Sequence, residues 1–248
     1  MNKHFVWTPF LLVGLCNDVF PQKHTTHVQQ SWFGYVNQAR ISEHWSTWLD
    51  LHLRTKEDFV TDLSTSIVRV GLTYQANERL KLTAGYAFVN FFPADDHPGV
   101  SQQEHRPWQQ ISWNSPGKRS RVLNYIRLEE RYRRKIKDAD ELADGYNFNY
   151  RARYNTMLLL PLSKRPFAPK SLSLNLNNEI QINFGKQIVY NYFDQNRFLA
   201  GFAYHTTATS YLQFGYMNLF QQLASGNQYR MTHAARVYYY HNVDLRKK

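Results

Sequence analysis

The stretch from residue 172 to residue 184, LSLNLNNEIQINF, decides the fold. Apolar and polar residues alternate along it, and a period of two is the period at which the side chains of a β-strand point to opposite faces. One face consists of Leu172, Leu174, Leu176, Ile180, Ile182 and Phe184, and the other of Ser173, Asn175, Asn177, Glu179, Gln181 and Asn183. The stretch therefore predicts a strand with one apolar and one polar face.

The same alternation returns along most of the chain. It is clear over residues 45–54, 80–88 and 147–155, and weaker over 31–42, 66–76, 107–114, 121–133, 196–207, 210–220 and 230–243. Together with the first stretch, these segments make eleven predicted strands. No segment shows a convincing 3.6-residue period of an amphipathic helix, so the pattern predicts an all-β protein.

Short and long connections alternate between the predicted strands. Short turns are expected at 42–44, 77–79, 115–118 and 206–209, and long polar links at 55–62, 93–107, 135–145, 186–195 and 221–228, while the link 164–170 departs from the rule. Short turns at one end and long loops at the other are typical of outer-membrane barrels. A soluble sandwich does not require this arrangement.

These patterns predict an antiparallel up-and-down transmembrane β-barrel of ten to twelve strands. Twelve is the best single value, because bacterial single-chain barrels usually have an even number of strands. The eleven strands counted from the pattern conflict with that value. Either residues 24–30 contribute a further strand or one of the weak segments is wrongly assigned.

The composition excludes several other classes of protein. The 248 residues include 17 Tyr, 16 Phe and 6 Trp, far more buriable surface than a disordered chain carries. No run approaches the roughly 20 apolar residues of a membrane-spanning helix. The net charge is +11, but many arginines alternate with aromatic residues inside predicted strands, which argues against nucleic acid as a partner. The single Cys16 excludes an intramolecular disulfide.

The first 22 residues resemble an export signal. Lys3 precedes the apolar run FVWTPFLLVGL at 5–15, which has the length of a signal-peptide core. We therefore expect a signal peptide over 1–22 and a single barrel domain over 23–248. Two alternatives stay open for this segment, namely a lipoprotein signal ending at Cys16 and the buried first strand of a cytosolic domain.

The two faces of the predicted strands indicate which side meets lipid. A cation at mid-depth in a bilayer costs about 2 to 4 kcal/mol, so a membrane barrel must turn its arginines inward and its apolar residues outward. A soluble lipocalin-like barrel would place the apolar face inside. Aromatic residues near the predicted strand ends, such as Trp32, Trp45 and Tyr192, favour the membrane barrel because such rings settle at the bilayer interface.

Several short motifs are similar to those of one family. They are SWFGY at 31–35, HRPWQQ at 105–110, RLEER at 127–131, NE at 178–179 and HNVDLR at 241–246. In these motifs the chain resembles domain-of-unknown-function family 2490, and the resemblance covers nearly all of the chain after residue 22. It implies an exported barrel of the bacterial outer membrane, of a kind frequent in the Bacteroidetes, with no assigned activity and no catalytic residues.

Charged residues on the polar faces are the candidate site. They are Arg69, Arg127, Glu129, Arg131, Arg151, Arg153, Glu179 and Arg197. In a narrow lumen these groups must pair with one another or bind an anion, because unpaired charges are costly away from water. Arg127, Glu129 and Arg131 share one face of one strand and are expected to meet Glu179 and the arginines of neighbouring strands.

Catalysis is less favoured by the sequence, but it stays open. Six histidines could supply a base, as in membrane-embedded lipid hydrolases that use Ser and His together: His52, His97, His105, His205, His233 and His241. No motif places any of them beside a serine. No metal-ligand spacing and no glycine-rich phosphate loop is present in the sequence, so no metal and no cofactor are expected.

Three hypotheses follow. The chain is an outer-membrane barrel with a structural role or a role in the transport of small solutes or anions, a membrane-embedded lipid hydrolase, or a soluble exported barrel that binds a lipid or anionic ligand. The first has the lipid bilayer, lipopolysaccharide and the outer-membrane insertion machinery as partners. It places the protein in the bacterial outer membrane.

Overall fold

Eleven β-strands form in the part of the chain that the structure, a computed structural model, describes: residues 23–56, 59–94, 97–117 and 119–246. They are β1 His24–Arg40, β2 Trp45–Thr55, β3 Leu63–Gln75, β4 Leu80–Phe91, β5 Gln102–Pro116, β6 Arg121–Ile136, β7 Leu142–Pro161, β8 Leu172–Phe184, β9 Phe193–His205, β10 Ser210–Gln222 and β11 Gln228–Asp244. The predicted signal peptide, residues 1–22, lies outside the described residues. Among those described, no helix is long and apolar enough to span a membrane.

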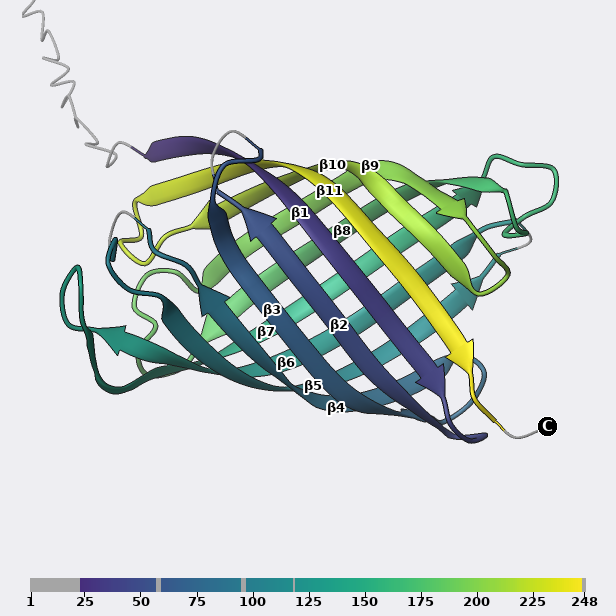
Figure 1. Ribbon diagram of the computed structural model, residues 1–248, viewed down its shortest axis with the longest axis horizontal. Helices are drawn as coiled ribbons and strands as arrows, with labels where there is room; N and C mark the ends of the chain where they lie inside the picture. The colour runs from purple at the N-terminus through teal and green to yellow at the C-terminus, as the bar shows by residue number, and fades with distance from the viewer. Residues whose placement is uncertain (1–22, 57–58, 95–96, 118, 247–248) are drawn as a thin grey trace, which may run out of the picture.

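The strands form one closed barrel in which each strand pairs with its neighbours in sequence. All of these pairs are antiparallel except the one that closes the barrel, because β1 and β11 run parallel from His24↔Gln228 to Arg40↔Asp244. Figure 1 shows β1 in purple beside β11 in yellow, both running toward the end of the barrel at which the C-terminus lies. The predicted all-β barrel is thus confirmed.

The best single value of twelve strands was wrong. Direction alternates around an antiparallel sheet, so an odd number of strands can close only where two parallel strands meet. The eleven described strands meet this condition at β1 and β11. Residues 24–30 do not form a separate strand, because they are the first part of β1 and pair with residues 228–234 of β11.

The connections divide the barrel into a turn end and a loop end. The turn end carries the connections 41–44, 76–79, 117–120, 162–171 and 206–209, and the loop end carries 56–62, 92–101, 137–141, 185–192 and 223–227. The longest connection at the turn end is 162–171, where the sequence already departed from the alternation. All five loops are shorter than expected, 92–101 and 137–141 most of all, because β5, β6 and β7 extend furthest beyond the predicted strands.

The alternation of residues sets the two sides of the wall. On β8, Asn175, Gln181 and Asn183 are buried, whereas Ile180 and Ile182 are exposed. Residues on the exposed side of the other strands include Leu82, Tyr154, Phe202 and Phe214. The barrel therefore presents its apolar side chains outward and most of its polar side chains inward.

Two clusters of buried apolar residues lie on the inner side of the wall. One joins Trp32, Leu199, Met217 and Tyr238 with neighbours from β1, β9, β10 and β11, and the other joins Ile67, Ala87, Val89 and Trp108 from β3, β4 and β5. Trp108 is fully buried because its indole lies against glycine. A Cβ atom at Gly85 would stand only 2.8 Å from the Trp108 ring, so no other residue type fits there without a shift.

Closure by β1 and β11 predicts a specific cross-link. Asn37 and His241 are register partners on these strands, and neighbouring strands lie about 4.8 Å apart, within reach of a disulfide. In a chain with Cys16 replaced by serine, Asn37→Cys together with His241→Cys should therefore oxidise to a disulfide. A mobility shift on a non-reducing gel after unfolding would report it.

The matched control is Asn37→Cys with Asn242→Cys, because residue 242 points to the opposite side of the wall. This pair should remain unlinked under the same oxidation. Cross-linking of both pairs, or of neither, would contradict the parallel closure and its register.

Candidate functional site

The barrel encloses a cavity of about 1460 Å³ that is rich in arginine. Its lining reaches from Ser64 and Asn191 near the loop end to Lys81 and Thr209 near the turn end. Among the described residues that line it are thirteen arginines and one lysine, against four carboxylates. Two further carboxylates, Glu104 and Glu129, are fully buried in the inner wall. The interior is therefore strongly cationic.

Glu129 on β6 is the centre of the largest ion-pair cluster. Arg151 on β7 donates to its Oε2 atom from Nε at 2.9 Å and from Nη2 at 2.6 Å, and Arg153 donates to Oε1 at 2.8 Å. Arg106 and Arg127 lie 3.8 and 3.9 Å from the same carboxylate. One buried negative charge thus faces four guanidinium groups, so Glu129 is the group whose removal would leave the most uncompensated charge.

Glu104 on β5 holds the arginines nearer to the loop end. Arg106 donates to its Oε1 atom from Nε at 2.7 Å, and Arg131 donates to both oxygens at 2.9 and 3.0 Å. The Arg131 fork therefore matches the carboxylate in the two-point geometry that makes such pairs strong. Asp194 on β9 extends the cluster by accepting from Arg151 Nη1 at 3.0 Å.

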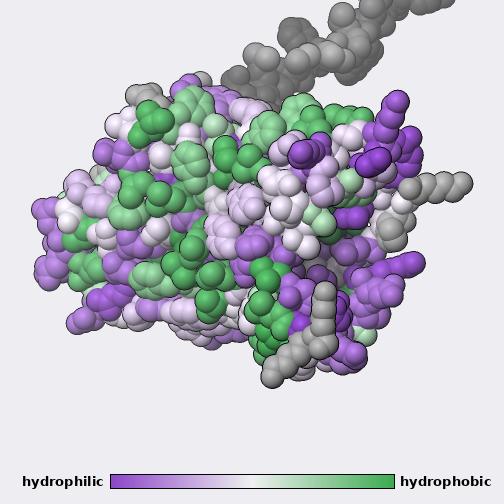
Figure 2. All heavy atoms as spheres, turned by 45° about the vertical axis from the view of Figure 1, so that its right-hand side comes forward, coloured by the Kyte–Doolittle hydropathy of each residue, from purple (hydrophilic) through white to green (hydrophobic). Residues whose placement is uncertain are grey.

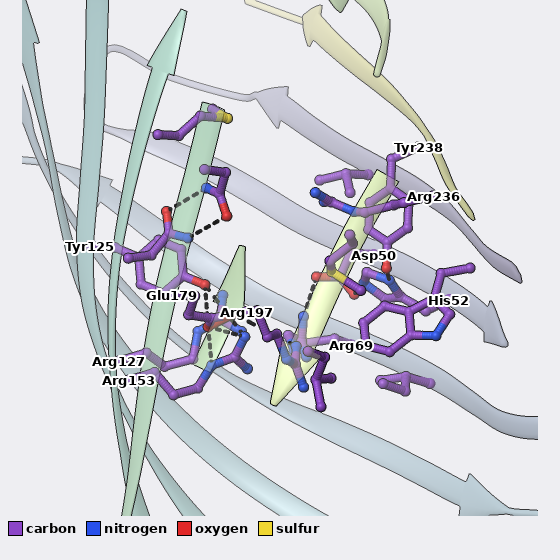
Figure 3. Close-up of a pocket in the computed structure, with 18 of the residues that line it drawn as sticks. Asp50, His52, Arg69, Tyr125, Arg127, Arg153, Glu179, Arg197, Arg236 and Tyr238 are labelled. Atoms are coloured by element: carbon purple, nitrogen blue, oxygen red, sulfur yellow. Dashed lines mark hydrogen bonds and ion pairs between the residues drawn. The ribbon is translucent and has the colours of Figure 1, made fainter. Parts of the chain in front are cut away.

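Glu179 on β8 joins Arg153, Tyr125 and Arg197 on one side of the lumen (Figure 3). It accepts from Arg153 Nε at 2.6 Å and from the Tyr125 hydroxyl at 2.8 Å, and Arg197 of β9 lies 3.6 Å from its second oxygen. Arg127 is held mainly by uncharged groups. Its Nε donates to Gln110 at 2.9 Å, and its guanidinium lies 4.4 Å from the Trp108 ring centroid.

Asp50 on β2 forms a separate group on the other side of the lumen (Figure 3). Arg69 of β3 donates to its Oδ2 atom, and His52 Nε2 lies 2.7 Å from Oδ1. The other ring nitrogen of His52 is 2.7 Å from the Tyr238 hydroxyl of β11. This chain of contacts connects β2, β3 and β11 at the wall of the cavity.

The structure brings most of the eight candidate residues together, in more than one group. Arg127, Glu129, Arg151, Arg153, Glu179 and Arg197 form one connected set. Arg131 contacts Glu104 instead of Glu179, and Arg69 contacts Asp50, so these two lie in neighbouring groups. Seven of the eight line the cavity, and the eighth, Glu129, is covered by the arginines around it.

Sequence reasoning missed the acidic partners. Glu104 and Arg106 lie in a segment that the sequence pattern predicts as a loop, because the outward residues His105, Pro107 and Gln109 of β5 are not hydrophobic and hide the alternation. Asp50 stands on the polar face of the clear pattern at 45–54, in register with Arg69. That cross-strand pairing of opposite charges is the signal that could have found it.

The six candidate histidines lie in different environments. His105, His233 and His241 contact tyrosines of the outer wall, and His52 lies in the Asp50 group. His205 has a serine beside it, because its Nε2 atom is 3.4 Å from Ser173 Oγ. Ser173 is fully buried, so its hydroxyl is not accessible to a substrate in this arrangement. In the described part of the chain no cluster of His, Cys, Asp and Glu could hold a metal ion.

The position of Glu129 predicts a strong effect of a small substitution. Glu129→Gln removes the charge shared by four arginines, and losing one partner of a buried ion pair costs about 3 to 5 kcal/mol, less where water enters. The variant should therefore unfold at a clearly lower temperature, measured by the gel-mobility shift of heated barrel in detergent. Glu141→Gln is the control, because its pair with Lys137 is exposed and worth at most about 1 kcal/mol. Equal melting of wild type and Glu129→Gln would rule out a stabilising role of the cluster.

Comparisons with known proteins place the chain in a family. No curated protein matches it. Among solved structures, a NanC porin in a rhombohedral crystal form is similar to it, with 12% sequence identity and a TM-score of 0.43, over 78% of this chain and 87% of that chain. The model of family DUF2490, described as a protein of unknown function, matches residues 29–230 and confirms the resemblance seen in the motifs. The chain therefore belongs to the DUF2490 family.

Proposed function

We propose that this protein spans the bacterial outer membrane and that its arginine-rich lumen admits small anionic solutes. The observation that carries the proposal is the opposite chemistry of the two sides of one wall. Apolar side chains cover the outer side, and a cavity with a large excess of cations lies on the inner side. A bilayer around the barrel would cover the apolar outer surface, and an anion inside it would balance the positive charge of the cavity.

The outer side supports a lipid environment. Large exposed apolar residues occur on almost every strand, among them Val70, Phe88, Ile126, Ile182 and Tyr216. Figure 2 shows apolar residues spread over the flank of the barrel, with hydrophilic residues gathered toward its ends. Soluble monomers rarely expose apolar surface of this extent, whereas a membrane barrel carries it as a continuous band.

The inner side supports anions as the solute. Arginine cannot lose its proton in a protein, so the excess positive charge in the cavity persists at all physiological pH values. A narrow passage lined by one sign of charge raises the local concentration of counter-ions and speeds their entry. Cations would meet an electrostatic barrier in the same space.

The proposed orientation follows other bacterial barrels. Their short turns face the periplasm and their long loops face outward, so the loop end would lie among lipopolysaccharide molecules. Lys23, Lys135 and Lys186 are exposed at that end and would meet the anionic groups of these lipids. Insertion would require the outer-membrane assembly machinery.

The alternative functions have less support. A soluble lipid-binding barrel would need an apolar interior, whereas charged groups dominate this one. A lipid hydrolase would need an accessible serine or other nucleophile with its base, and the buried Ser173 beside His205 does not meet that need. A purely structural barrel differs from the proposal in one measurable property, which is conductance.

The facing of the wall predicts a difference between two arginine substitutions on β8. Ile180→Arg places a cation in the apolar outer surface, at a cost of about 2 to 4 kcal/mol if that surface lies near the middle of a bilayer. Asn177→Arg adds the same side chain on the lumen side. The first variant should fold poorly into phospholipid vesicles and the second nearly as well as wild type, as measured by protease protection. Equal folding yields would contradict the membrane assignment.

The lumen predicts selectivity for anions. In a planar bilayer with a potassium chloride gradient, the barrel should conduct with a reversal potential that favours chloride, because cations dominate its lining. Cell fractionation should recover the protein with the outer membrane. A cation-selective current, or no current from correctly folded protein, would argue against transport and in favour of a structural barrel.

A further inference from the structure

The charges of the lumen are compensated unevenly around the barrel. Glu104, Glu129, Glu179 and Asp194 belong to β5, β6, β8 and β9. On the opposite side, β11, β1 and β2 bring Arg236 and Arg54 to the cavity, and Asp50 is already engaged by Arg69 and His52. Arg54 and Arg236 therefore lie at the cavity without an ion pair to any carboxylate of the described residues.

Arg54 is the clearest case of an uncompensated cation. Its guanidinium carbon lies 3.6 Å from the centroid of the Trp32 ring. Its Nε atom is buried without a hydrogen-bond partner, and no carboxylate of the described chain lies within ion-pair distance of it. A cation in such a place is stabilised by the ring but still lacks an anion.

Arg197 of β9 lies near the same ring. Its guanidinium carbon lies 5.2 Å from the Trp32 centroid, and its Nε atom donates to Gln195 at 3.1 Å. Among the described residues its carboxylate contact is the 3.6 Å approach to Glu179, which Arg153 engages more closely. Two guanidinium groups thus lie near one indole ring, and their like charges repel each other. An anion between them would offset that repulsion.

The ring itself is held rigidly. Trp32 donates from Nε1 to Gln30 at 2.8 Å, and it packs in the apolar cluster with Val36 and Leu199. It is 3% exposed, so its orientation is fixed by packing and not by solvent. The platform under the two arginines is therefore preorganised, which reduces the entropy that a bound ligand must lose.

Arg236 does not belong to this arrangement. It is the register partner of Trp32 on β11, but its guanidinium lies 3.8 Å from the Tyr238 ring centroid and donates to the Tyr240 hydroxyl at 3.2 Å. Its polar atoms thus have partners that those of Arg54 lack.

We propose that Arg54 and Arg197, held over Trp32, form an oxyanion-binding site in the lumen, which takes the carboxylate or phosphate group of a small solute. The planar fork of arginine matches both groups in two-point contact, and neither guanidinium makes such a two-point contact with a carboxylate of the described residues. A spherical chloride ion makes no such two-point contact. This inference deepens the proposed passage of anions and rests on it for its biological purpose.

Binding can be measured without transport. Isothermal titration of the chain folded in detergent micelles with inorganic phosphate, and separately with succinate, should give saturable binding to one site. Chloride at the same ionic strength should compete only weakly. Arg54→Gln should weaken the binding of both probes about tenfold or more, because a charge-assisted contact contributes about 1.5 to 3 kcal/mol.

Two further variants keep the test decisive. Arg54→Lys preserves the charge and loses the fork, so it should bind with intermediate affinity even if Arg54→Gln folds poorly. Lys81→Gln removes a lumen cation at the turn end of β4, whereas Arg54 lies at the loop end of β2. This control variant should change the affinity by less than about twofold. Unchanged binding in folded Arg54→Gln, or equal competition by chloride, would overturn the site.

The outcome also separates this inference from the proposed function. Saturable binding without conductance would leave the oxyanion site standing and remove the passage. Anion-selective conductance without saturable binding would support the passage of anions and remove the oxyanion site.

Discussion

Closure of the sheet between β1 and β11 is the constraint on which the rest of the structure depends. A closed wall has only an inside and an outside, so the alternation of one strand, carried through the register, fixes the facing of all the others. The parallel pairing brings Trp32 of β1 beside Arg236 of β11 and, through β2, beside Arg54. The chemistry of the interior is therefore a consequence of how the ends of the sheet meet.

Confinement then determines how the charges are arranged. Arginines that alternate along strands are brought to one small volume by closure, and their repulsion is offset by a few fully buried carboxylates. Glu129 and Glu104 each serve several guanidinium groups, while Gln110 and Trp108 hold Arg127 through a hydrogen bond and a cation–π contact. Gly71 and Gly85 make room for that indole against β3 and β4. Packing and electrostatics are thus coupled at the centre of the lumen.

Much of this could be predicted from the sequence, and the failures have physical reasons. Period-two alternation predicted the eleven strands and the inward arginines, because β8 and its neighbours separate polar from apolar residues. It failed at β5, where both faces carry polar residues and Glu104 was placed in a loop. The count of eleven strands already required a parallel closure, and the expectation of an even number led instead to the wrong value of twelve. Which carboxylate serves which arginine depends on register, and register is set by the whole barrel.

The uneven compensation of charge has a further meaning for a protein that must also be stable. A network in which every arginine has its own carboxylate would be a stable plug, whereas on the β5 to β9 side the arginines share four buried carboxylates, and Glu129 alone faces four of them. On the β11–β1–β2 side, Arg54 rests on an aromatic ring, which lowers the cost of its burial without neutralising it. Replacing the ring by a carboxylate would stabilise the charge and close the site to other anions. A cation held by an indole remains available to a ligand, and this distinction separates a lumen that only supports the barrel from one that can select a solute.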